Sequence, residues 1–463
     1  MSAKPLIIMN QDLKNIKLNN NVMAELSQGL RGEIYAPGDK SISHRCVILS
    51  SIALGESRIN GLLESTDVVC TIEAMRSLGC DISLKENTCI INGIGIGSLM
   101  EPIAPLDFGN SGTAARLIMG LVSTHPIKSI FTGDESLSKR PMKRVVDPLI
   151  EFGAEFTLNK SEFFPIVVNG SKLPIPISYI TPIPSAQVKS AILLAGLNTP
   201  GITSVIEKQK TRDHTERLLE IYGYDVAIEE NKENTKISIV GQQILEAVNI
   251  NIPGDPSSAG YPIVAGLICK DSNLTVKNIL VNPTRDGLYK SLIEMGAKID
   301  LLNKRSEAGE EVFDISVRSS NLRGIEVPAS RAPSMIDDFP ILAVAASVAD
   351  GISIFRGLSE LKVKESDRLL GIKHFLEVNG VDVSISNDDL IIKGSPGGIS
   401  GGGSVNTNLD HRMAMSSLVL GLVSNSPVLI DDSDTINTSF PGFINLMVKL
   451  GAKLKILDLS KQR

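Results

Sequence analysis

The amino-acid sequence predicts a mixed α/β (α+β) protein made of two similar domains, each built from three β-α-β-α-β-β repeats around buried helices. Three observations carry this prediction. A glycine closes an amphipathic helix six times, at intervals of 70 to 84 residues. An almost wholly apolar helix precedes each of these amphipathic helices, and short stretches of alternating polarity accompany them. A regular internal period means that each repeat is one packing unit, so the period determines the architecture.

The amphipathic helix of each repeat is recognised by its end. Apolar residues recur at helical spacing and stop at a glycine, the residue that most readily adopts the positive φ found just past a helix terminus. The six closing glycines are Gly79, Gly153, Gly223, Gly296, Gly380 and Gly451.

The other helix of each repeat is rich in small and apolar residues on every side. Such a helix must be buried, because no face of it is suited to water. Three of them can pack together with sheets around them, which gives an inside-out α/β barrel. The six predicted buried helices cover residues 45–54, 114–122, 186–197, 258–268, 340–348 and 412–423.

The strands alternate in polarity, as half-buried strands do, at residues 80–84, 298–301 and 381–385. We expect one domain over residues 39–253 and a second over 1–38 plus 254–463, hinged by two crossovers near Gly38 and residues 253–255. Residues 32–36 are expected to form a strand of the second domain. A protein-binding repeat scaffold is the non-enzymatic alternative, although scaffold repeats are usually shorter, about 20–50 residues.

The composition narrows the class of protein. The formal net charge of −6 argues against a general nucleic-acid binder. Five cysteines without a CxxC pair are typical of free thiols in a reducing compartment. The apolar stretch at residues 5–9 is too short for a signal peptide or a membrane span. We expect a soluble cytoplasmic monomer without a cofactor, and no metal, since the five histidines lack metal-ligand spacing.

Eight polar clusters interrupt the repeats. At least four stand where a buried helix begins, so the fold would bring them together between the two domains. Among the charged residues chosen from these clusters, five cations outnumber two acids, so the expected ligand is multiply anionic, with a phosphate and a carboxylate. The cations are Lys40, Arg140, Lys364, Arg368 and Arg412, and the acids are Asp337 and Glu365. An acid and a lysine among them suit proton transfer. The clusters cover residues 37–45, 107–116, 134–142, 184–189, 211–215, 334–340, 361–368 and 409–415.

These clusters closely resemble those of the 5-enolpyruvylshikimate-3-phosphate synthase family, in the same order and almost end to end. The stretch at residues 211–215 is typical of one bacterial branch. The resemblance implies two domains of three repeats and a cofactor-free reaction of the shikimate pathway. That reaction moves the enolpyruvyl group of phosphoenolpyruvate to the 5-hydroxyl of shikimate 3-phosphate and releases phosphate. The matching stretches are 37–41, the glycine-asparagine loop of the cluster 107–116, 139–142, 211–215, 363–368, 410–412 and 438–441.

The resemblance also implies a role for each matching residue. Asp337 would accept the hydroxyl proton, Glu365 would protonate the methylene carbon, and Lys40 would touch both substrates. The residues implied for shikimate 3-phosphate are Lys40, Ser41, Arg45, Ser185, Ala186, Gln187, Arg212, Asp337 and Lys364. Those implied for phosphoenolpyruvate are Lys40, Gly112, Arg140, Gln187, Arg368 and Arg412.

Two positions depart from relatives. Thr438 stands where the better-known branch has a lysine, so one phosphate contact must come from elsewhere or be missing. Gly112 stands where some glyphosate-tolerant relatives carry alanine, and we hypothesise that the missing methyl makes this protein easier to inhibit. The enzymatic alternative is the sister transferase that acts on UDP-N-acetylglucosamine. That family has a reactive cysteine in a loop that matches residues 134–140, which contain none.

Overall fold

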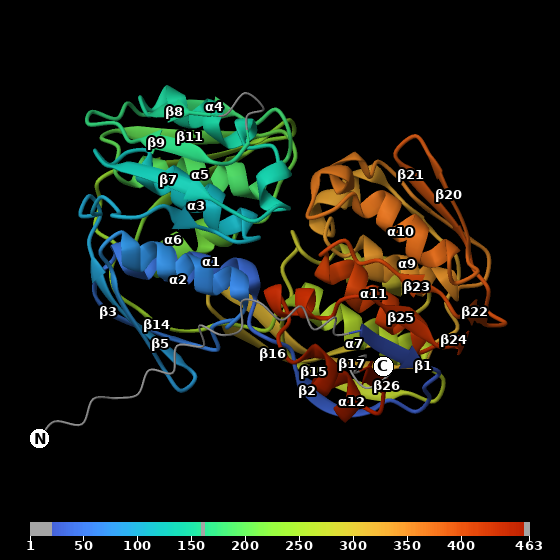
Figure 1. Ribbon diagram of the computed structural model, residues 1–463. Coiled ribbons are helices and arrows are strands. Elements are labelled where there is room, and N and C mark those ends of the chain that lie inside the picture. Colours follow the sequence, from blue (N-terminus) through green and yellow to red (C-terminus); the bar gives the residue numbers. More distant parts are fainter. Residues whose placement is uncertain (1–20, 159–162, 458–463) are drawn as a thin grey trace, which may run out of the picture.

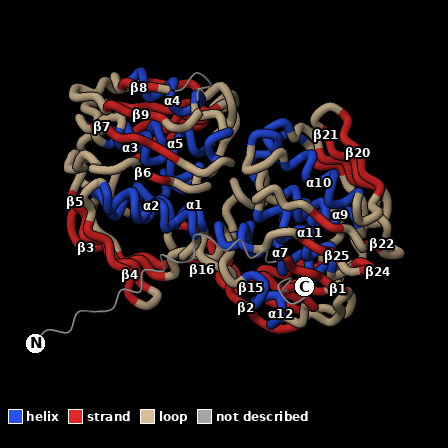
Figure 2. The backbone as a smooth tube through the Cα atoms, viewed as in Figure 1, coloured by secondary structure: helices blue, strands red, loops and turns tan. Residues whose placement is uncertain are grey.

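The computed structural model describes residues 21–158 and 163–457, and these fold into two halves that lie side by side (Figure 1). The predicted short apolar stretch at residues 5–9 lies outside the described residues. In each half, helices occupy the middle and strands lie around them, as the tube in Figure 2 shows for α3 and α5 in one half and for α9 and α11 in the other. The predicted α/β fold with buried helices is therefore confirmed.

The six buried helices occur where the apolar pattern predicted them. Their starts lie up to five residues earlier, because polar residues cap them: Asp39 accepts a hydrogen bond from the amide of Ile42 at 2.8 Å, so α1 begins at Lys40. In the second half α7, α9 and α11 contact one another. The helices are α1 (Lys40–Ile52), α3 (Gly112–Val122), α5 (Ala186–Leu197), α7 (Pro256–Ile268), α9 (Phe339–Ser347) and α11 (His411–Gly421).

The six amphipathic helices end as predicted. All six closing glycines have φ between +76° and +102°, a left-handed conformation that disfavours any residue with a Cβ. The helices are α2 (Thr66–Ser77), α4 (Lys143–Glu151), α6 (His214–Ile221), α8 (Gly287–Glu294), α10 (Arg368–Glu377) and α12 (Phe443–Lys449).

Three four-stranded sheets surround the helices of the first half. In each, the first two strands are parallel and the other two pair antiparallel. The sheet orders are β14 (Asn249–Asn251), β3 (Leu54–Asn60), β5 (Thr88–Ile94), β4 (Asp81–Lys85); β6 (Leu106–Asp107), β7 (Lys128–Thr132), β9 (Ile166–Asn169), β8 (Glu155–Thr157); and β10 (Ser178–Ile180), β11 (Ile202–Glu207), β13 (Thr235–Val240), β12 (Val226–Glu230).

The second half repeats this topology. A small extra sheet pairs β22 (Ile399–Gly401) with β24 (Ser424–Ser426). The main orders are β2 (Arg31–Tyr35), β15 (Asn273–Leu280), β17 (Glu310–Arg318), β16 (Lys298–Glu307); β18 (Glu326–Val327), β19 (Ile352–Phe355), β21 (Asp389–Lys393), β20 (Asp382–Ser386); and β23 (Ser404–Val405), β25 (Val428–Ile430), β1 (Asn21–Glu25), β26 (Lys453–Leu457).

Three strands leave their sequence neighbours to complete a distant repeat. The predicted N-terminal strand, β2, pairs in parallel with β15 of the second half, and β1 completes the last sheet there. In exchange, β14 fills the first position in the first sheet of the first half. The sheets that contain β2, β1 and β14 are therefore complete only because a strand comes from a distant part of the chain, whereas the other three four-stranded sheets consist of consecutive strands.

The two crossovers lie side by side. The amide of Asp39 donates to the carbonyl of Pro253 at 2.8 Å, and the amide of Asp255 donates to that of Pro37 at 2.9 Å. Two separate hydrophobic cores lie on either side, one built mainly from residues 42–252 and one from 22–34 and 259–452. These cores support our proposed domain division into 39–253 and 1–38 plus 254–463, of which residues 1–20, 159–162 and 458–463 lie outside the described residues.

All five cysteines are free, as predicted. Among the described residues, the helices are all too short or too polar to cross a membrane.

Candidate active site

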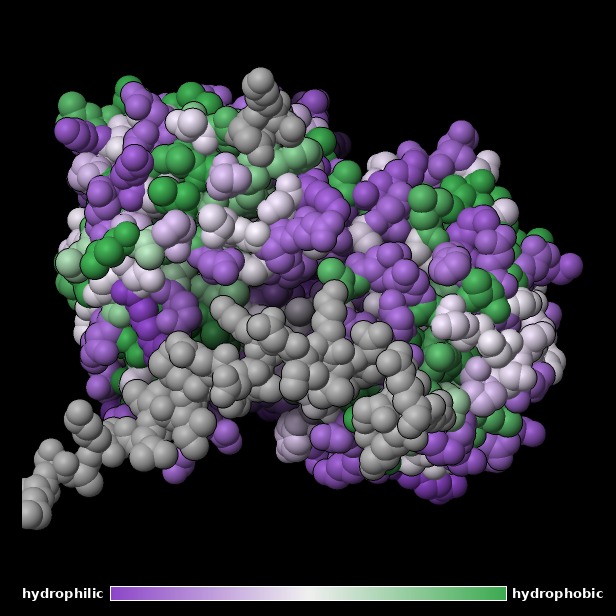
Figure 3. Space-filling view, in the orientation of Figure 1, coloured by the Kyte–Doolittle hydropathy of each residue, from purple (hydrophilic) through white to green (hydrophobic). Residues whose placement is uncertain are grey.

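A cavity of about 480 Å³ lies between the two halves and is lined by residues of both. Figure 3 shows hydrophilic residues on both sides of the groove where the halves meet. Nine lining side chains are cationic and four are carboxylates, so the cavity is strongly positive although the protein is acidic. Such a cavity concentrates anions. The cations are Lys40, Arg45, Arg116, Arg140, Arg144, Arg212, Arg285, Lys364 and Arg412.

Helix starts supply part of this lining. Side chains at the beginning of α1, α3, α5 and α11 reach the cavity, as the position of the polar clusters in the repeats predicted. The unpaired amides of a helix start carry a partial positive charge, which adds to that of the lysines and arginines. Twelve of the fourteen predicted site residues line the cavity; the exceptions are Gly112 and Arg368.

Asp337 is held by cations from both halves. Arg212 donates to its Oδ2 at 2.7 Å, Arg368 donates to its Oδ1 at 3.0 Å, and Lys364 Nζ lies 3.6 Å from Oδ1. Burial alone would raise the pKa of Asp337, but Lys364, Arg212 and their neighbours hold it well below its usual value. The group is therefore ionised and able to accept a proton.

Glu365 lies beside Asp337 on the same arginine. Arg368 Nη2 is 2.5 Å from Glu365 Oε2, and Arg140 Nη1 is 3.6 Å from Oε1. Burial would raise the pKa of Glu365, whereas Arg368 and Arg140 hold it well below its usual value. An anion that engages these arginines weakens their hold, so a bound anion raises the pKa of Glu365.

The two predicted residues outside the lining stand directly behind it. Arg368 is fully buried, and three carboxylates occupy its guanidinium: Asp337, Glu365 and Asp410, the last through Nε at 2.8 Å. Gly112 begins α3, and a Cβ there would lie 3.0 Å from Arg140 Nη1 and 3.1 Å from Arg116 Nη1. Arg368 therefore holds Asp337 and Glu365 in place, and Gly112 leaves room for Arg140 and Arg116.

Lys40 and Arg45 are fixed by neighbours, of which Asp67 and Ser190 lie outside the predicted polar clusters. Lys40 forms an ion pair with buried Asp67. Arg45 donates to Thr215 Oγ1 and Ser190 Oγ at 2.7 Å and to the carbonyl of Ser41 at 2.9 Å. Burial lowers the pKa of Arg45 to about 10, a value at which it is still cationic at neutral pH.

Four further basic side chains of the lining were not predicted as ligands: Arg116, Arg144, Arg285 and His411. Arg116 donates to Gln187 Oε1 at 2.7 Å, and Arg144 lies 3.0 Å from Glu360 of the other half. Arg116 and His411 stand in predicted polar clusters, so their position was a signal. Arg144 lies on an amphipathic helix, where a cation usually faces solvent.

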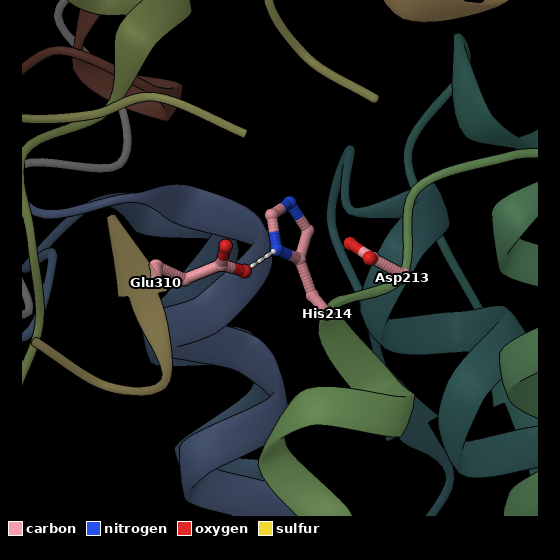
Figure 4. Close-up of side chains that lie close together, drawn as sticks. All are labelled: Asp213, His214 and Glu310. Atoms are coloured by element: carbon pink, nitrogen blue, oxygen red, sulfur yellow. Dashed lines mark hydrogen bonds and ion pairs between the residues drawn. The ribbon is translucent and has the colours of Figure 1, made fainter. Parts of the chain in front are cut away.

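A cluster at the crossovers tests the prediction that the protein binds no metal. Potential ligand atoms of Asp213, His214 and Glu310 lie within 4.8 Å of one another (Figure 4). His214 Nδ1 is 2.7 Å from Glu310 Oε1, and Arg285 Nη1 is 3.3 Å from His214 Nε2. Arg217 lies 2.9 Å from Asp213 and 3.6 Å from Glu310. With two arginines against them these groups fit an ion-pair network between the halves better than a metal site, and the absence of metal stays a prediction.

We call this network, with the carboxylates that Arg285 joins, the hinge cluster: Asp39, Asp213, His214, Asp255, Arg285 and Glu310. Arg285 Nη1 lies 3.1 Å from Asp39, which caps α1, and Nη2 lies 3.2 Å from Asp255, which caps α7. One arginine thus ties together the first buried helix of each half.

Comparison with known proteins agrees with this architecture. The chain is 38% identical to EPSP synthase from Acinetobacter baumannii, whose solved structure superposes with a TM-score of 0.84 over 95% of this chain and 100% of that one. The enolpyruvyl transferase NikO from Streptomyces tendae, at 18% identity and a TM-score of 0.74 over 95% of this chain and 99% of that one, shares the fold.

The sequence comparisons cover nearly the whole chain. The 3-phosphoshikimate 1-carboxyvinyltransferase of Chelativorans sp. (strain BNC1) is 54% identical over 93% of this chain and 97% of its own length. That of Brucella canis is 52% identical over 93% and 96%. Residues 25–447 match the family description EPSP synthase (3-phosphoshikimate 1-carboxyvinyltransferase), and with relatives this similar along both chains, the protein belongs to that family.

Proposed function

We propose that the protein transfers the enolpyruvyl group of phosphoenolpyruvate to the 5-hydroxyl of shikimate 3-phosphate and releases phosphate. The observation that carries this proposal is the pair Asp337 and Glu365, which share one arginine at a cavity rich in cations. The cations suit two phosphorylated substrates, and the two carboxylates suit a reaction that moves a proton off one atom and onto another.

Shikimate 3-phosphate binds, in this proposal, to the side of the cavity formed by α1 and α5 and by the loops that carry Arg212, Asp337 and Lys364. Asp337 accepts a hydrogen bond from a ring hydroxyl, and Lys364 supports it. The residues in contact are Lys40, Ser41, Arg45, Ser185, Ala186, Gln187, Arg212, Asp337 and Lys364.

Phosphoenolpyruvate binds beside it, where Lys40, Arg140, Gln187 and Arg412 offer donors. Arg140 donates to Asn110 and to Ser136 Oγ at 3.3 Å, so its guanidinium is already oriented. Planar guanidinium groups suit the carboxylate and the phosphate of this substrate. Gly112 keeps the space next to Arg140 open, and Arg368 contributes from behind.

The two carboxylates act in sequence. In the addition step, Asp337 takes the proton from the 5-hydroxyl as its oxygen attacks C2, and Glu365 gives a proton to C3. In the elimination step, C3 returns a proton to Glu365, the bond from C2 to the phosphate oxygen breaks, and Asp337 passes the hydroxyl proton to the departing phosphate. Substrate binding prepares this cycle, because the anions offset the charges of Arg140 and Arg368 and so raise the pKa of Glu365.

The two halves enclose this chemistry. Arg212 to Asp337, Ser136 Oγ to the carbonyl of Glu365 at 2.8 Å, and Arg144 to Glu360 all cross the cavity from one half to the other. A closed cavity excludes water and so limits hydrolysis of phosphoenolpyruvate. We further propose that the protein acts as a cytoplasmic monomer and needs no cofactor.

The test measures phosphate release from phosphoenolpyruvate with shikimate 3-phosphate, with UDP-N-acetylglucosamine, and with neither. We expect release with shikimate 3-phosphate alone. Release with the nucleotide sugar alone would select the sister transferase, and no release in any mixture would favour the protein-binding scaffold.

A further inference from the structure

His411 is a buried histidine at the cavity whose ring is only half partnered. It is the first residue of α11, is 3% exposed and lines the cavity. Its Nδ1 lies 3.1 Å from Thr438 Oγ1, whereas its Nε2 is buried without a hydrogen-bond partner in the described part of the chain. A buried polar atom without a partner is destabilising, so a ligand that completes this nitrogen would remove the penalty.

The hydrogen bonds of Thr438 define which ring nitrogen carries the proton. Thr438 is the last residue of the short helix η5 (Asp434–Thr438), and its hydroxyl donates to the carbonyl of Thr435 at 2.8 Å. A hydroxyl has a single proton, so toward His411 it acts as an acceptor. We infer from this pattern that Nδ1 of His411 carries the proton, which leaves Nε2 with a lone pair.

The charges around His411 are mixed. Lys40 on α1, Arg412 on its own helix and Arg368 on α10 act against protonation, and Glu365 acts for it. Burial, Lys40 and Arg412 hold the pKa of His411 well below its usual value, so the ring is neutral while no anion is bound. An anion that engages Lys40 and Arg412 reverses this balance.

We propose that His411 is a further binding residue for the phosphate of phosphoenolpyruvate, and that its Nε2 takes up a proton when this phosphate enters. Thr438 is the positioning residue that keeps Nδ1 protonated and Nε2 directed to the ligand. This inference rests on the proposed function for the identity of the anion. A phosphate dianion adjoining an imidazole stabilises the imidazolium, and the charged Nε2–H then donates to a phosphate oxygen.

Protonated His411 would be a cation that is present in the cavity only when the substrate is bound. A permanent lysine would add to the repulsion among Lys40, Arg368 and Arg412 in the free protein. A histidine that is neutral in the free protein avoids that repulsion, and it supplies its charge once the phosphate is bound. The side chain that contacts Nδ1 of His411 is the uncharged Thr438, so it adds no further positive charge.

The direct test is nitrogen NMR of the histidine-labelled full-length protein. We expect His411, identified by the signal lost in His411→Gln, to be neutral and protonated at Nδ1 in the free protein. It should become an imidazolium on addition of either inorganic phosphate or phosphoenolpyruvate with shikimate 3-phosphate. A ring that stays neutral in both, or that carries its proton on Nε2 in the free protein, would overturn the proposal.

A second measurement counts protons taken up on binding inorganic phosphate, by calorimetry in buffers of different ionisation enthalpy. His411→Gln should take up about one proton fewer than the parent protein. His125→Gln is the matched control, because His125 is also buried with an unpartnered Nε2 but lies outside the cavity lining; it should match the parent. The number of protons taken up by Thr438→Val should lie between that of the parent protein and that of His411→Gln.

The two proposals fail in different ways. If uptake with phosphate is seen but phosphoenolpyruvate and shikimate 3-phosphate give no turnover, the function is wrong and His411 is still a phosphate ligand. If turnover is seen and all three variants take up the same number of protons as the parent, the inference about His411 is wrong and the function stands.

Discussion

The cavity and the hinge cluster both gather buried charges from the two halves, but they balance those charges differently. Apart from Arg285 and Asp255, which belong to both, the cavity has eight cations and three carboxylates. In the hinge cluster Arg285 joins Asp39 and Asp255, and backbone amides satisfy the carboxylates further: Asp255 accepts from the amides of Ser257 at 2.7 Å and Lys40 at 3.2 Å. The difference teaches that the cavity has an excess of cations, which an anion from solution can balance, whereas the hinge cluster pairs its arginine with carboxylates of the protein itself.

The largest effect is expected from the cavity. Asp337→Asn keeps the size of the side chain but removes the group that accepts the hydroxyl proton. We expect kcat to fall by about 10²- to 10⁴-fold, with both substrates still bound. Steady-state kinetics and calorimetric titration with shikimate 3-phosphate measure the two quantities.

The control for Asp337→Asn is Asp314→Asn. Asp314 is also buried and paired with an arginine, Arg305 at 2.9 Å, but it lies on β17 away from the cavity lining. Near-normal turnover by Asp337→Asn, or an equal loss in both variants, would contradict the assigned role.

A substitution in the hinge cluster should instead lower the free energy of unfolding. Arg285→Met leaves Asp39 and Asp255, which are 0% and 5% exposed, without their cation. Breaking a buried ion pair in this way costs about 3–5 kcal/mol of unfolding free energy. Urea unfolding measures that loss.

An exposed pair provides the comparison for Arg285→Met. Arg58 lies 2.6 Å from Glu56 on the surface of β3, and Arg58→Met should change stability little, since solvent screens the pair. If Arg285→Met were as stable as Arg58→Met, the hinge cluster would not hold the halves together.

Much of the fold was predictable from the sequence, because the helices and their ends depend on local residue patterns. The closing glycines and the apolar helices depend on residues within one or two turns, and both were predicted correctly. The positions of β1 and β14 were not predicted, because their partners lie hundreds of residues away and short strands carry little pattern of their own. Only the expected place of β2 in the second half pointed to such an exchange.

The residues that line the cavity were easier to predict from the sequence than the way in which their side chains are arranged. Arg368, which the resemblance implied for phosphoenolpyruvate, lies fully buried among three carboxylates, because sequence position does not give the direction of a long side chain. Its contact with the substrate stays a prediction. Asp67, the partner of Lys40, follows a helix cap at Ser65, and an acid in the first turn of a helix is too common to be a signal.

A smaller effect in the cavity concerns the space at Gly112. An added methyl would press on Arg140 and Arg116 at 3.0 and 3.1 Å, and overpacking of this kind costs about 1–3 kcal/mol. We expect Gly112→Ala to raise KM for phosphoenolpyruvate, and to raise the inhibition constant of glyphosate by a larger factor. Competitive inhibition assays give both constants.

Gly397→Ala is the matched control for Gly112→Ala, because a Cβ at Gly397 would meet no atom within 4 Å. Inhibition by glyphosate that is unchanged in Gly112→Ala would refute the hypothesis that the missing methyl makes room for the inhibitor.

The smallest expected effect comes from the hydroxyl of Ser136, which links the two halves over the cavity and also accepts a hydrogen bond from Arg140 at 3.3 Å. Ser136 Oγ, next to η2 (Leu137–Lys139), donates to the carbonyl of Glu365 at 2.8 Å across the two halves. Ser138, two residues on, donates to Gly133 within its own half at 3.2 Å. A hydrogen bond contributes about 0.5–1.5 kcal/mol, so Ser136→Ala should raise KM roughly two- to tenfold while Ser138→Ala leaves it unchanged. Because both variants remove one hydroxyl from the same loop, equal KM values would show that closure does not depend on the contact between the halves.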